Sequence, residues 1–276
     1  MIKLMYITNR PSIAEIAESA GVDRIFVDLE SLGKQKRQGG MDTVQSHHTL
    51  EDVANIRSAI TEAELLVRCN PIHDACPGYC GSDQEIETII RNGADIVMLP
   101  FFKRPAEAEY FISQVGGRAK IDLLIETPEA VAAIDEILAL PGVDEVHIGL
   151  NDLSLGYQKK FMFELMCDGT VERICEKCRD ANIPCGIGGI ASLGRGMLPA
   201  EYLIKEHYRL GSTAAILSRS FCNANRIENI NIIRRIFGNG VREIRAFEYE
   251  CMEADQESLM SNKRMLDKIV REIVEK

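Results

Sequence analysis

The chain of 276 residues lacks several features that define whole classes of protein. It contains no apolar run that approaches the length of a membrane-spanning helix, which excludes a membrane protein built from such helices. It has no basic tail and carries a net charge of −10, which argues against a nucleic-acid scaffold. It also has no low-complexity segment and no internal repeat of about 20 to 50 residues, so a solenoid is not expected.

Signals for export are missing as well. The chain opens MIKLMYITNR, without the apolar region of a signal peptide, so we expect a cytoplasmic protein. Its nine cysteines should then be free thiols. A zinc site is conceivable from two cysteine pairs, but one spacing is loose and the other pair falls within an expected helix, so structural thiols are the better interpretation. The pairs are Cys76 with Cys80 and Cys175 with Cys178.

Strand-like and helix-like segments alternate along most of the chain, which is typical of parallel βα units. We expect strands at residues 2–8, 24–30, 64–69, 95–100, 121–125, 145–150, 184–188 and 214–220. Eight such units close a barrel, and the length permits one large domain. The sequence therefore predicts an α/β fold, a TIM (β/α)8 barrel over residues 1–225.

Beyond the last expected strand the pattern becomes purely helical. Helices are expected at residues 226–237, 241–253 and 257–274, with a break at Gly238-Asn239-Gly240. One helix would complete the barrel and the others are surplus. We therefore predict a C-terminal helical extension over residues 226–276.

The most informative stretch runs from Lys120 to Tyr157 and reads KIDLLIETPEAVAAIDEILALPGVDEVHIGLNDLSLGY. One strand ends in Glu126, a helix follows to about Leu140, and a second strand ends at Asn151-Asp152. Carboxyl ends of parallel strands meet at one mouth, so Glu126 and Asp152 are expected to face it together. Such a pair suits Mg²⁺ or Mn²⁺, whereas the alternative is a helix cap and a loop contact.

The segment IETPEAV followed by PGVDEVHIGLNDLS resembles the metal-site signature of the HpcH/HpaI aldolase and citrate lyase superfamily. The similarity extends to VDLE (27–30), LLVRCN (65–70), GADIVMLPFF (93–102) and GIGGIA (186–191). The resemblance implies that Glu126 and Asp152 bind a divalent cation, which is Mg²⁺, Mn²⁺ or Co²⁺. It also implies a homo-oligomer, because a C-terminal helix of the family packs on a neighbouring subunit. Packing on its own barrel is the alternative.

Three charged residues near other strand ends complete the implied site. Asp28 and Glu30 point to the same face, and the family uses the matching acids to hold metal waters or orient a histidine. Arg68 interrupts an apolar run, and a buried arginine needs anionic partners. The family's matching arginine binds the carbonyl and enolate of a 2-oxo acid. The alternative for Asp28 and Glu30 is a salt bridge to lysines of the following loop. The alternative for Arg68 is a structural salt bridge to Glu30 or Glu126.

The sequence departs from the family pattern at Ser31, where hydroxycinnamate-type aldolases of the family carry a histidine that acts as general acid and base. The loop that follows ends in His47-His48, on the same expected mouth, and either histidine could transfer the proton. Loop packing or helix capping is the alternative. The remaining histidines, His73, His147 and His207, are weaker candidates, and His147 is expected to pack in the barrel wall.

Glycines in GIGGIA are expected to let the backbone approach a ligand. Gly188 and Gly189, together with Gly186, could expose N–H groups to a carboxylate or phosphate. The alternative is a tight corner of the chain. Other candidates for substrate or anion contacts are Asn151, Arg195, Ser218, Arg219 and Ser220.

These observations predict a divalent-metal-dependent carbon–carbon lyase of the aldolase type, acting on a 2-oxo acid, pyruvate by family likeness, and an aldehyde. Because Lys103 and Lys120 lie away from strand ends, a Schiff-base mechanism is not favoured. One alternative is an acyl-CoA thioester lyase of the citrate and malyl-CoA type, with Lys34, Lys36 and Arg37 near a nucleotide phosphate. An alternative of another class is a non-catalytic metabolite-binding barrel or assembly subunit.

Overall fold

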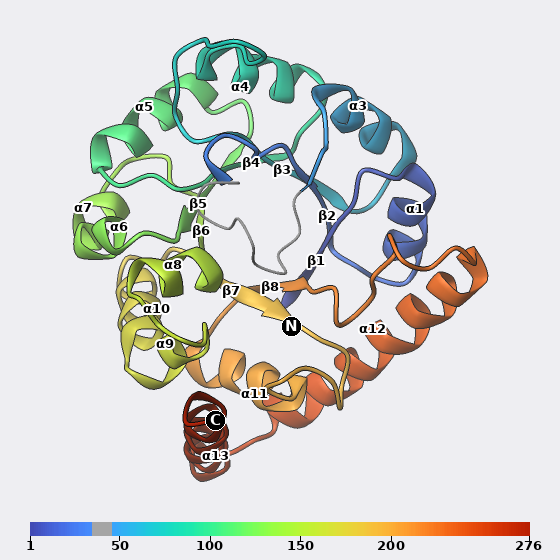
Figure 1. Ribbon diagram of the computed structural model, residues 1–276, viewed down its shortest axis with the longest axis vertical. Helices are drawn as coiled ribbons and strands as arrows, with labels where there is room; N and C mark the ends of the chain where they lie inside the picture. Colours follow the sequence, from blue (N-terminus) through green and yellow to red (C-terminus); the bar gives the residue numbers. More distant parts are fainter. Residues whose placement is uncertain (35–45) are drawn as a thin grey trace.

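The computed structural model describes residues 1–34 and 46–276, and its centre is a closed barrel of parallel strands (Figure 1). Each strand pairs with the next one in the sequence, and the last pairs with the first. The predicted TIM (β/α)8 barrel is therefore confirmed. The strands are β1 (Lys3–Ile7), β2 (Arg24–Asp28), β3 (Glu64–Arg68), β4 (Ile96–Leu99), β5 (Lys120–Ile125), β6 (Glu145–Ile148), β7 (Cys185–Ile190) and β8 (Ala214–Leu217).

Helices surround the barrel in the order of the sequence (Figure 1). Helix α3 begins at Leu50, and the side chains of its N-cap residue Thr49 and of Asp52 form the capping box expected from the sequence. The helices are α1 (Pro11–Ser19), α3 (Leu50–Ala59), α4 (Ser82–Arg91), α5 (Pro105–Val115), α6 (Pro128–Ala132), α7 (Ile134–Leu138), α8 (Leu150–Gly156), α9 (Glu164–Cys167), α10 (Thr170–Asp180), α11 (Ala200–Leu210), α12 (Ile230–Met252) and α13 (Gln256–Val274).

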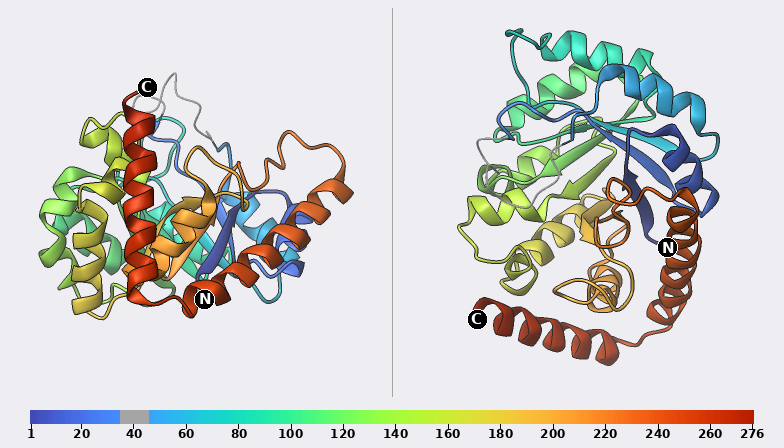
Figure 2. Two further views of the ribbon diagram at one scale, coloured as in Figure 1. Left: turned by 90° about the horizontal axis from the view of Figure 1, so that it is seen from below. Right: turned by 45° about the vertical axis from the view of Figure 1, so that its right-hand side comes forward.

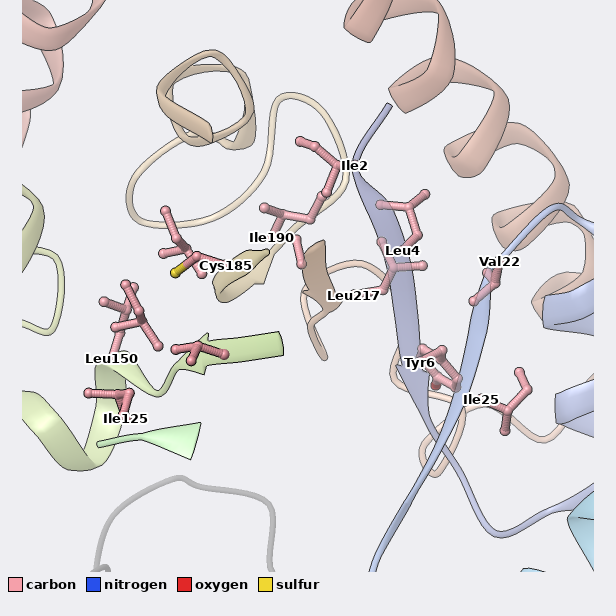
Figure 3. Close-up of a cluster of buried hydrophobic side chains, with 14 of the residues drawn as sticks. Ile2, Leu4, Tyr6, Val22, Ile25, Ile125, Leu150, Cys185, Ile190 and Leu217 are labelled. Atoms are coloured by element: carbon pink, nitrogen blue, oxygen red, sulfur yellow. The ribbon is translucent and has the colours of Figure 1, made fainter. Parts of the chain in front are cut away.

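Alternate residues of each strand point to opposite faces of the sheet, so the strands supply two apolar cores. Met5 and Phe26 belong to the smaller cluster, which fills the barrel interior. Leu4 and Ile25, one position earlier on the same strands, join the larger core between strands and helices. Figure 3 shows part of this outer core. Because both faces are buried, the strands read as nearly continuous apolar runs.

Two boundaries near the predicted metal residues differ from the sequence-based expectation. The helix expected up to Leu140 is split into α6 and α7 at Ala133. The strand expected to run to residue 150 ends at Ile148, and Gly149 turns the chain into α8. Asp152 therefore lies in the first turn of a helix and not at the end of a strand.

The expected break at residues 238–240 is wrong, because α12 is one continuous helix of 23 residues. Gly240 faces Phe221, and a Cβ at position 240 would lie 2.7 Å from a ring carbon of that side chain. The glycine therefore permits close packing of α12 on the barrel instead of ending the helix.

The two C-terminal helices pack on the barrel of the same chain (Figure 2). Helix α12 contacts α1 and α11, and α13 contacts α11 and α9. Glu248 of α12 accepts hydrogen bonds from the Ile2 amide at 2.6 Å and the Tyr208 hydroxyl at 2.9 Å, which ties the start of β1 to this helix. Contact with a neighbouring subunit, and the division of the chain at residue 225, stay predictions.

The amino-terminal end of the barrel is closed by buried charges. Arg24 pairs with Glu64 at 2.9 Å and with Glu145 at 2.8 Å, and all three residues begin strands. Burial and the nearby Glu145 carboxylate raise the pKa of Asp122 well above its usual range. The raised pKa favours the protonated form of Asp122, and the polar groups at this end leave the opposite end of the barrel for ligands.

The composition leads us to expect no membrane-spanning helix and free cysteine thiols. In the described parts of the chain, no helix is long and apolar enough to cross a membrane. All nine cysteines are free, and most of them are buried. Cys175 and Cys178 are buried on α10, whereas Cys76 is exposed in the loop before α4.

His207 should make the protein sensitive to acid. Burial lowers the pKa of this α11 histidine from 6.5 to about 3. Between these values the unfolded chain binds a proton that the folded chain does not, so the free energy of unfolding falls as pH falls. We expect His207→Gln to be less stable than wild type at pH 7. When the pH is lowered from 6 to 4.5, the free energy of unfolding of the variant should fall by ~2 kcal/mol less than that of wild type. Urea denaturation at the two pH values measures this difference. Equal losses in both proteins would contradict this assignment.

Candidate active site

A cavity of about 610 Å³ lies at the carboxyl ends of the barrel strands. Barrel enzymes place their sites at this end, because the loops after the strands converge there. The cavity gathers predicted residues from distant parts of the sequence, which are His47, His48, Arg68, Glu126, Asn151, Asp152, Gly188, Gly189, Ser218 and Arg219. It does not include Ser31, Arg195 or Ser220 among its lining residues. Lys36 and Arg37 lie outside the described residues.

Glu126 follows β5 and is held against the chain that leaves β4. Its Oε1 accepts a hydrogen bond from the Phe101 amide at 2.9 Å, and the residue is 4% exposed. A Cβ at Gly149 would lie 2.7 Å from Oε2, so only glycine at this position leaves room for the carboxylate. The local sequence therefore shapes a recess for Glu126 at the start of α8.

Asp152 reaches the same cavity from the first turn of α8 and is 6% exposed. Two buried carboxylates beside one cavity form an oxygen donor set that suits a hard divalent cation. Among the described residues, no group of three or more His, Cys, Asp and Glu side chains could hold a metal. The donor set thus fits a cation that takes its other ligands from water or substrate.

A compact ion cluster borders the opposite part of the cavity. Arg68 donates two hydrogen bonds to Asp28, each of 2.8 Å, and its guanidinium lies 3.4 Å from Glu30. Lys34 adds contacts of 2.9 Å to Asp28 and 3.3 Å to Glu30. Two carboxylates and two cations therefore compensate each other in a buried site, which fixes all four side chains.

The cluster sets the charge states of its members. Burial alone would raise the pKa of Asp28, but Arg68 and Lys34 hold it well below its ordinary value. Burial alone would lower the pKa of Arg68, but Asp28 and Glu30 raise it well above its usual value. Both shifts favour the charged forms of Asp28 and Arg68.

Arg68 serves the cluster and also lines the cavity. Nε and Nη2 contact Asp28, and the hydrogen bonds of the described residues do not use Nη1. The alternative role expected for Arg68 from the sequence is a salt bridge to Glu30 or Glu126, and the structure shows the contact with Glu30. The Nη1 group is left without a hydrogen bond to the described residues. Asp28 and Glu30 do not line the cavity themselves and hold Arg68 and Lys34 from beneath it.

The sequence suggests Lys34 as a partner of a nucleotide phosphate, and it offers salt bridges to loop lysines as the alternative role of Asp28 and Glu30. The structure shows these salt bridges. Lys34 is 5% exposed, lines the cavity and pairs with the acids of the cluster. The sequence offers one weak signal, because Lys34 follows Glu30 by four residues and such pairs meet within one helical turn.

The histidines take separate places. His47 is exposed and lines the cavity, whereas His48 is half-buried beside it, with Nδ1 accepting a hydrogen bond from the Asp28 amide at 3.0 Å. His147 also lines the cavity, so the expectation that it only packs in the wall is incomplete. Its Nε2 lies 3.2 Å from the Gly188 carbonyl oxygen, and burial lowers its pKa to about 4.

Two other histidines lie away from the cavity. His207 is on α11 and bonds Ser212, and His73 bonds carbonyl groups of the loop before α4. Ser31 does not line the cavity, and its hydroxyl donates to the Tyr79 hydroxyl at 3.1 Å. Ser31 occupies the sequence position of the family histidine, but it contributes no side chain to the cavity.

The glycines of β7 allow close approach of backbone to the cavity. Gly188 has a φ of 38°, and a Cβ there would lie 2.7 Å from Leu150. A Cβ on Gly189 would lie 3.1 Å from the Ile216 carbonyl oxygen. The register shift between Gly186 and Gly189 marks a bulge, a feature that often re-aims strand ends beside active sites.

One wall of the cavity was not anticipated from the sequence. The end of β1 and the loop after β8 contribute polar side chains that carry no recognisable spacing, which are Thr8, Asn9, Asn223 and Asn225. Only closure of the barrel between β1 and β8 brings these segments together.

A closed parallel barrel with a cavity at its carboxyl end that holds both carboxylates and basic side chains is typical of barrel enzymes that act on small molecules. The family model for HpcH/HpaI aldolase/citrate lyase matches residues 3–187. The chain belongs to this family, whose members are aldolases and lyases.

Solved structures share the fold at low sequence identity. The HpcH/HpaI aldolase from Desulfitobacterium hafniense DCB-2 is 16% identical with a TM-score of 0.60, over 88% of this chain and 93% of that chain. An HpcH/HpaI aldolase/citrate lyase family protein from Burkholderia cenocepacia J2315 is 14% identical with a TM-score of 0.62, over 84% and 95%. The citrate synthase SbnG is 16% identical with a TM-score of 0.57, over 79% and 85%. No curated protein matches the sequence.

Removing Arg68 should destabilise the fold. Arg68→Met leaves Asp28 and Glu30 buried with Lys34 as their only cation among the described residues, and we expect a loss of about 3–5 kcal/mol in the free energy of unfolding. Arg68→Lys keeps the charge and should lose less. Arg104→Met removes an exposed arginine paired with Glu107 and should change stability little. Urea denaturation measures all three, and equal effects of Arg68→Met and Arg104→Met would refute the role of the cluster.

Proposed function

We propose that the protein is a divalent-metal-dependent carbon–carbon lyase of the aldolase type, which cleaves or forms a bond through the enolate of a 2-oxo acid. The observation that carries the proposal is the meeting of Glu126, Asp152 and Arg68 at one cavity. Membership of a family of aldolases and lyases supports it.

Glu126 and Asp152 would hold the cation, since both are buried carboxylates beside the cavity. Family resemblance implies a divalent ion, Mg²⁺, Mn²⁺ or Co²⁺. When bound, such an ion acts as a Lewis acid toward the oxygens of the 2-oxo acid.

Arg68 would stabilise the negative charge that develops on the substrate oxygen. Its Nη1 group makes no hydrogen bond to the described residues, and the cluster with Asp28 and Glu30 fixes the guanidinium before substrate arrives. A donor that is already oriented loses little energy to reorganisation during the reaction, so the interaction strengthens as charge develops.

The carboxylate of the 2-oxo acid has a suitable place beside β7. Gly188 and Gly189 bring backbone to the cavity wall, and Asn151 lies beside the proposed metal ligand Asp152. Proton transfer is assigned to His47 or His48, which replace the missing histidine after Glu30.

Among the described residues, Lys34 is the lysine that lines the cavity, and it does not favour a Schiff-base mechanism. The Nζ atom of Lys34 contacts the carboxylates of Asp28 and Glu30, so it is directed to these acids and not to a substrate carbonyl. The same pairing weakens the acyl-CoA alternative, because Lys34 does not present its charge to a phosphate.

A test that requires no knowledge of the aldehyde follows the pyruvate methyl protons by NMR in D₂O with Mg²⁺ or Mn²⁺ and then with EDTA. We expect cation-dependent exchange with deuterium in wild type, and at least a ~100-fold slower rate in Glu126→Gln and in Asp152→Asn. Glu129→Gln is the matched control, because Glu129 is three residues away but half-exposed and paired with Lys103.

Other outcomes lead to the alternatives. Exchange that survives EDTA and Glu126→Gln would rule out the metal-dependent mechanism. Without exchange under any cation, pyruvate is rejected as the donor, and binding of CoA at millimolar concentration then distinguishes the thioester lyase from a metabolite-binding barrel. The cytoplasmic location and the homo-oligomer formed through residues 226–276 remain part of the proposal.

A further inference from the structure

The strands β1 and β2 separate at the mouth of the barrel. Their pairing extends to Ile7 opposite Phe26, and the Thr8 amide still donates to the Phe26 carbonyl. Beyond this point the amide of Asp28 finds another partner, the Nδ1 atom of His48 at 3.0 Å. An imidazole therefore takes the place of a strand neighbour and satisfies a buried N–H group.

This hydrogen bond fixes the proton of the ring. A backbone amide can only donate, so Nδ1 of His48 must accept and cannot carry a hydrogen. The neutral ring then carries its proton on Nε2, at the edge that faces away from β2. His48 lines the cavity, and the described residues form no hydrogen bond with its Nε2, so this N–H group can serve a ligand.

The position of the ring is also fixed. His48 directly precedes Thr49, which forms the capping box with Asp52 at the start of α3. The Asn9 side chain donates to Asp52 at 3.2 Å and links this helix start to the end of β1. The same residue that holds Nδ1 through its amide holds Arg68 through its carboxylate, so both groups are oriented by Asp28.

We infer that His48 acts as a neutral hydrogen-bond donor, from Nε2–H to the carbonyl oxygen of the substrate, and not as the general base. The inference deepens the proposed function and rests on it. A base needs an unshared electron pair, but the pair on Nδ1 is engaged by the Asp28 amide and Nε2 already carries hydrogen. Among the two candidate histidines, the role of base then falls to His47.

The burial of His48, and not the balance of charges around it, agrees with this role. Asp28 and Asp52 favour the protonated ring, and Lys34 and His47 oppose it. Burial has the largest effect and lowers the pKa of His48 below its ordinary value. A neutral imidazole polarises a carbonyl without bringing a further full charge to a site that already holds Arg68.

The tautomer can be measured without turnover. In protein labelled with ¹⁵N-histidine, multiple-bond ¹H–¹⁵N NMR reports which ring nitrogen carries hydrogen, and His48→Gln assigns the signal. We expect the Nε2–H form at pH 7, and we expect the ring of His48 to take up a second proton only at a lower pH than an unperturbed histidine does, because burial lowers its pKa. A ring protonated on Nδ1 at pH 7 would overturn the inference.

The rate at which the pyruvate methyl protons exchange in variants of His48 distinguishes a hydrogen-bond donor from a general base. Gln keeps an N–H donor near the position of Nε2 but has no basic nitrogen, so His48→Gln should stay within ~10-fold of wild type, whereas His48→Ala should lose ~100-fold. The decline of the rate toward acid should persist in His48→Gln and flatten in His47→Gln. Equal losses in His48→Gln and His48→Ala, with the acid decline abolished in His48→Gln, would show that His48 is the base.

Failure of the proposed function is distinguishable from failure of this inference. If wild type shows no exchange with any cation, the aldolase proposal falls, and the NMR signal of the His48 Nε2 proton is followed during addition of pyruvate. A shift of this proton on binding supports the donor role, and an unchanged signal at saturating pyruvate overturns it.

Discussion

The pairing of Asp28 with Arg68 is the interaction on which the rest of the site depends. The two residues face each other in the register of β2 and β3, so closure of the barrel itself creates the pair. Removing both charges from water is costly, and the cost is offset only because Glu30 and Lys34 complete a cluster of two carboxylates and two cations. Through its amide, the same aspartate also positions His48.

This arrangement divides the cavity into two electrostatic parts. On the side of β5 and α8, Glu126 and Asp152 bring negative charge that suits a hard cation. On the side of β2 and β3, the compensated cluster and His48 present donors without a large net charge. A substrate whose oxygens contact both parts would be polarised between cation and donors, which is the requirement of enolate chemistry. The position of each donor is set before binding, because strand register and a helix cap hold it.

Errors in the sequence-based expectations have physical causes. Gly238-Asn239-Gly240 has the composition of a helix break, yet α12 continues because Gly240 packs closely on Phe221. Asp152 was expected at a strand end, yet it lies on α8 because Gly149 turns the chain early to leave space for Glu126. In both places glycine is needed because a side chain from a distant part of the sequence lies too close for a Cβ. Local sequence propensity contains no information about such a contact.

The sequence by itself determined the barrel, because eight apolar segments alternate with helical ones and both faces of parallel strands must be buried. It also placed Glu126, Asp152 and Arg68 at the mouth, since each lies at or just beyond the end of a strand. Only the tertiary structure decided which charges pair, what Lys34 contacts and which nitrogen of His48 carries hydrogen. Those outcomes depend on side chains that approach from different strands and loops, and their distances follow from barrel closure and not from spacing along the chain.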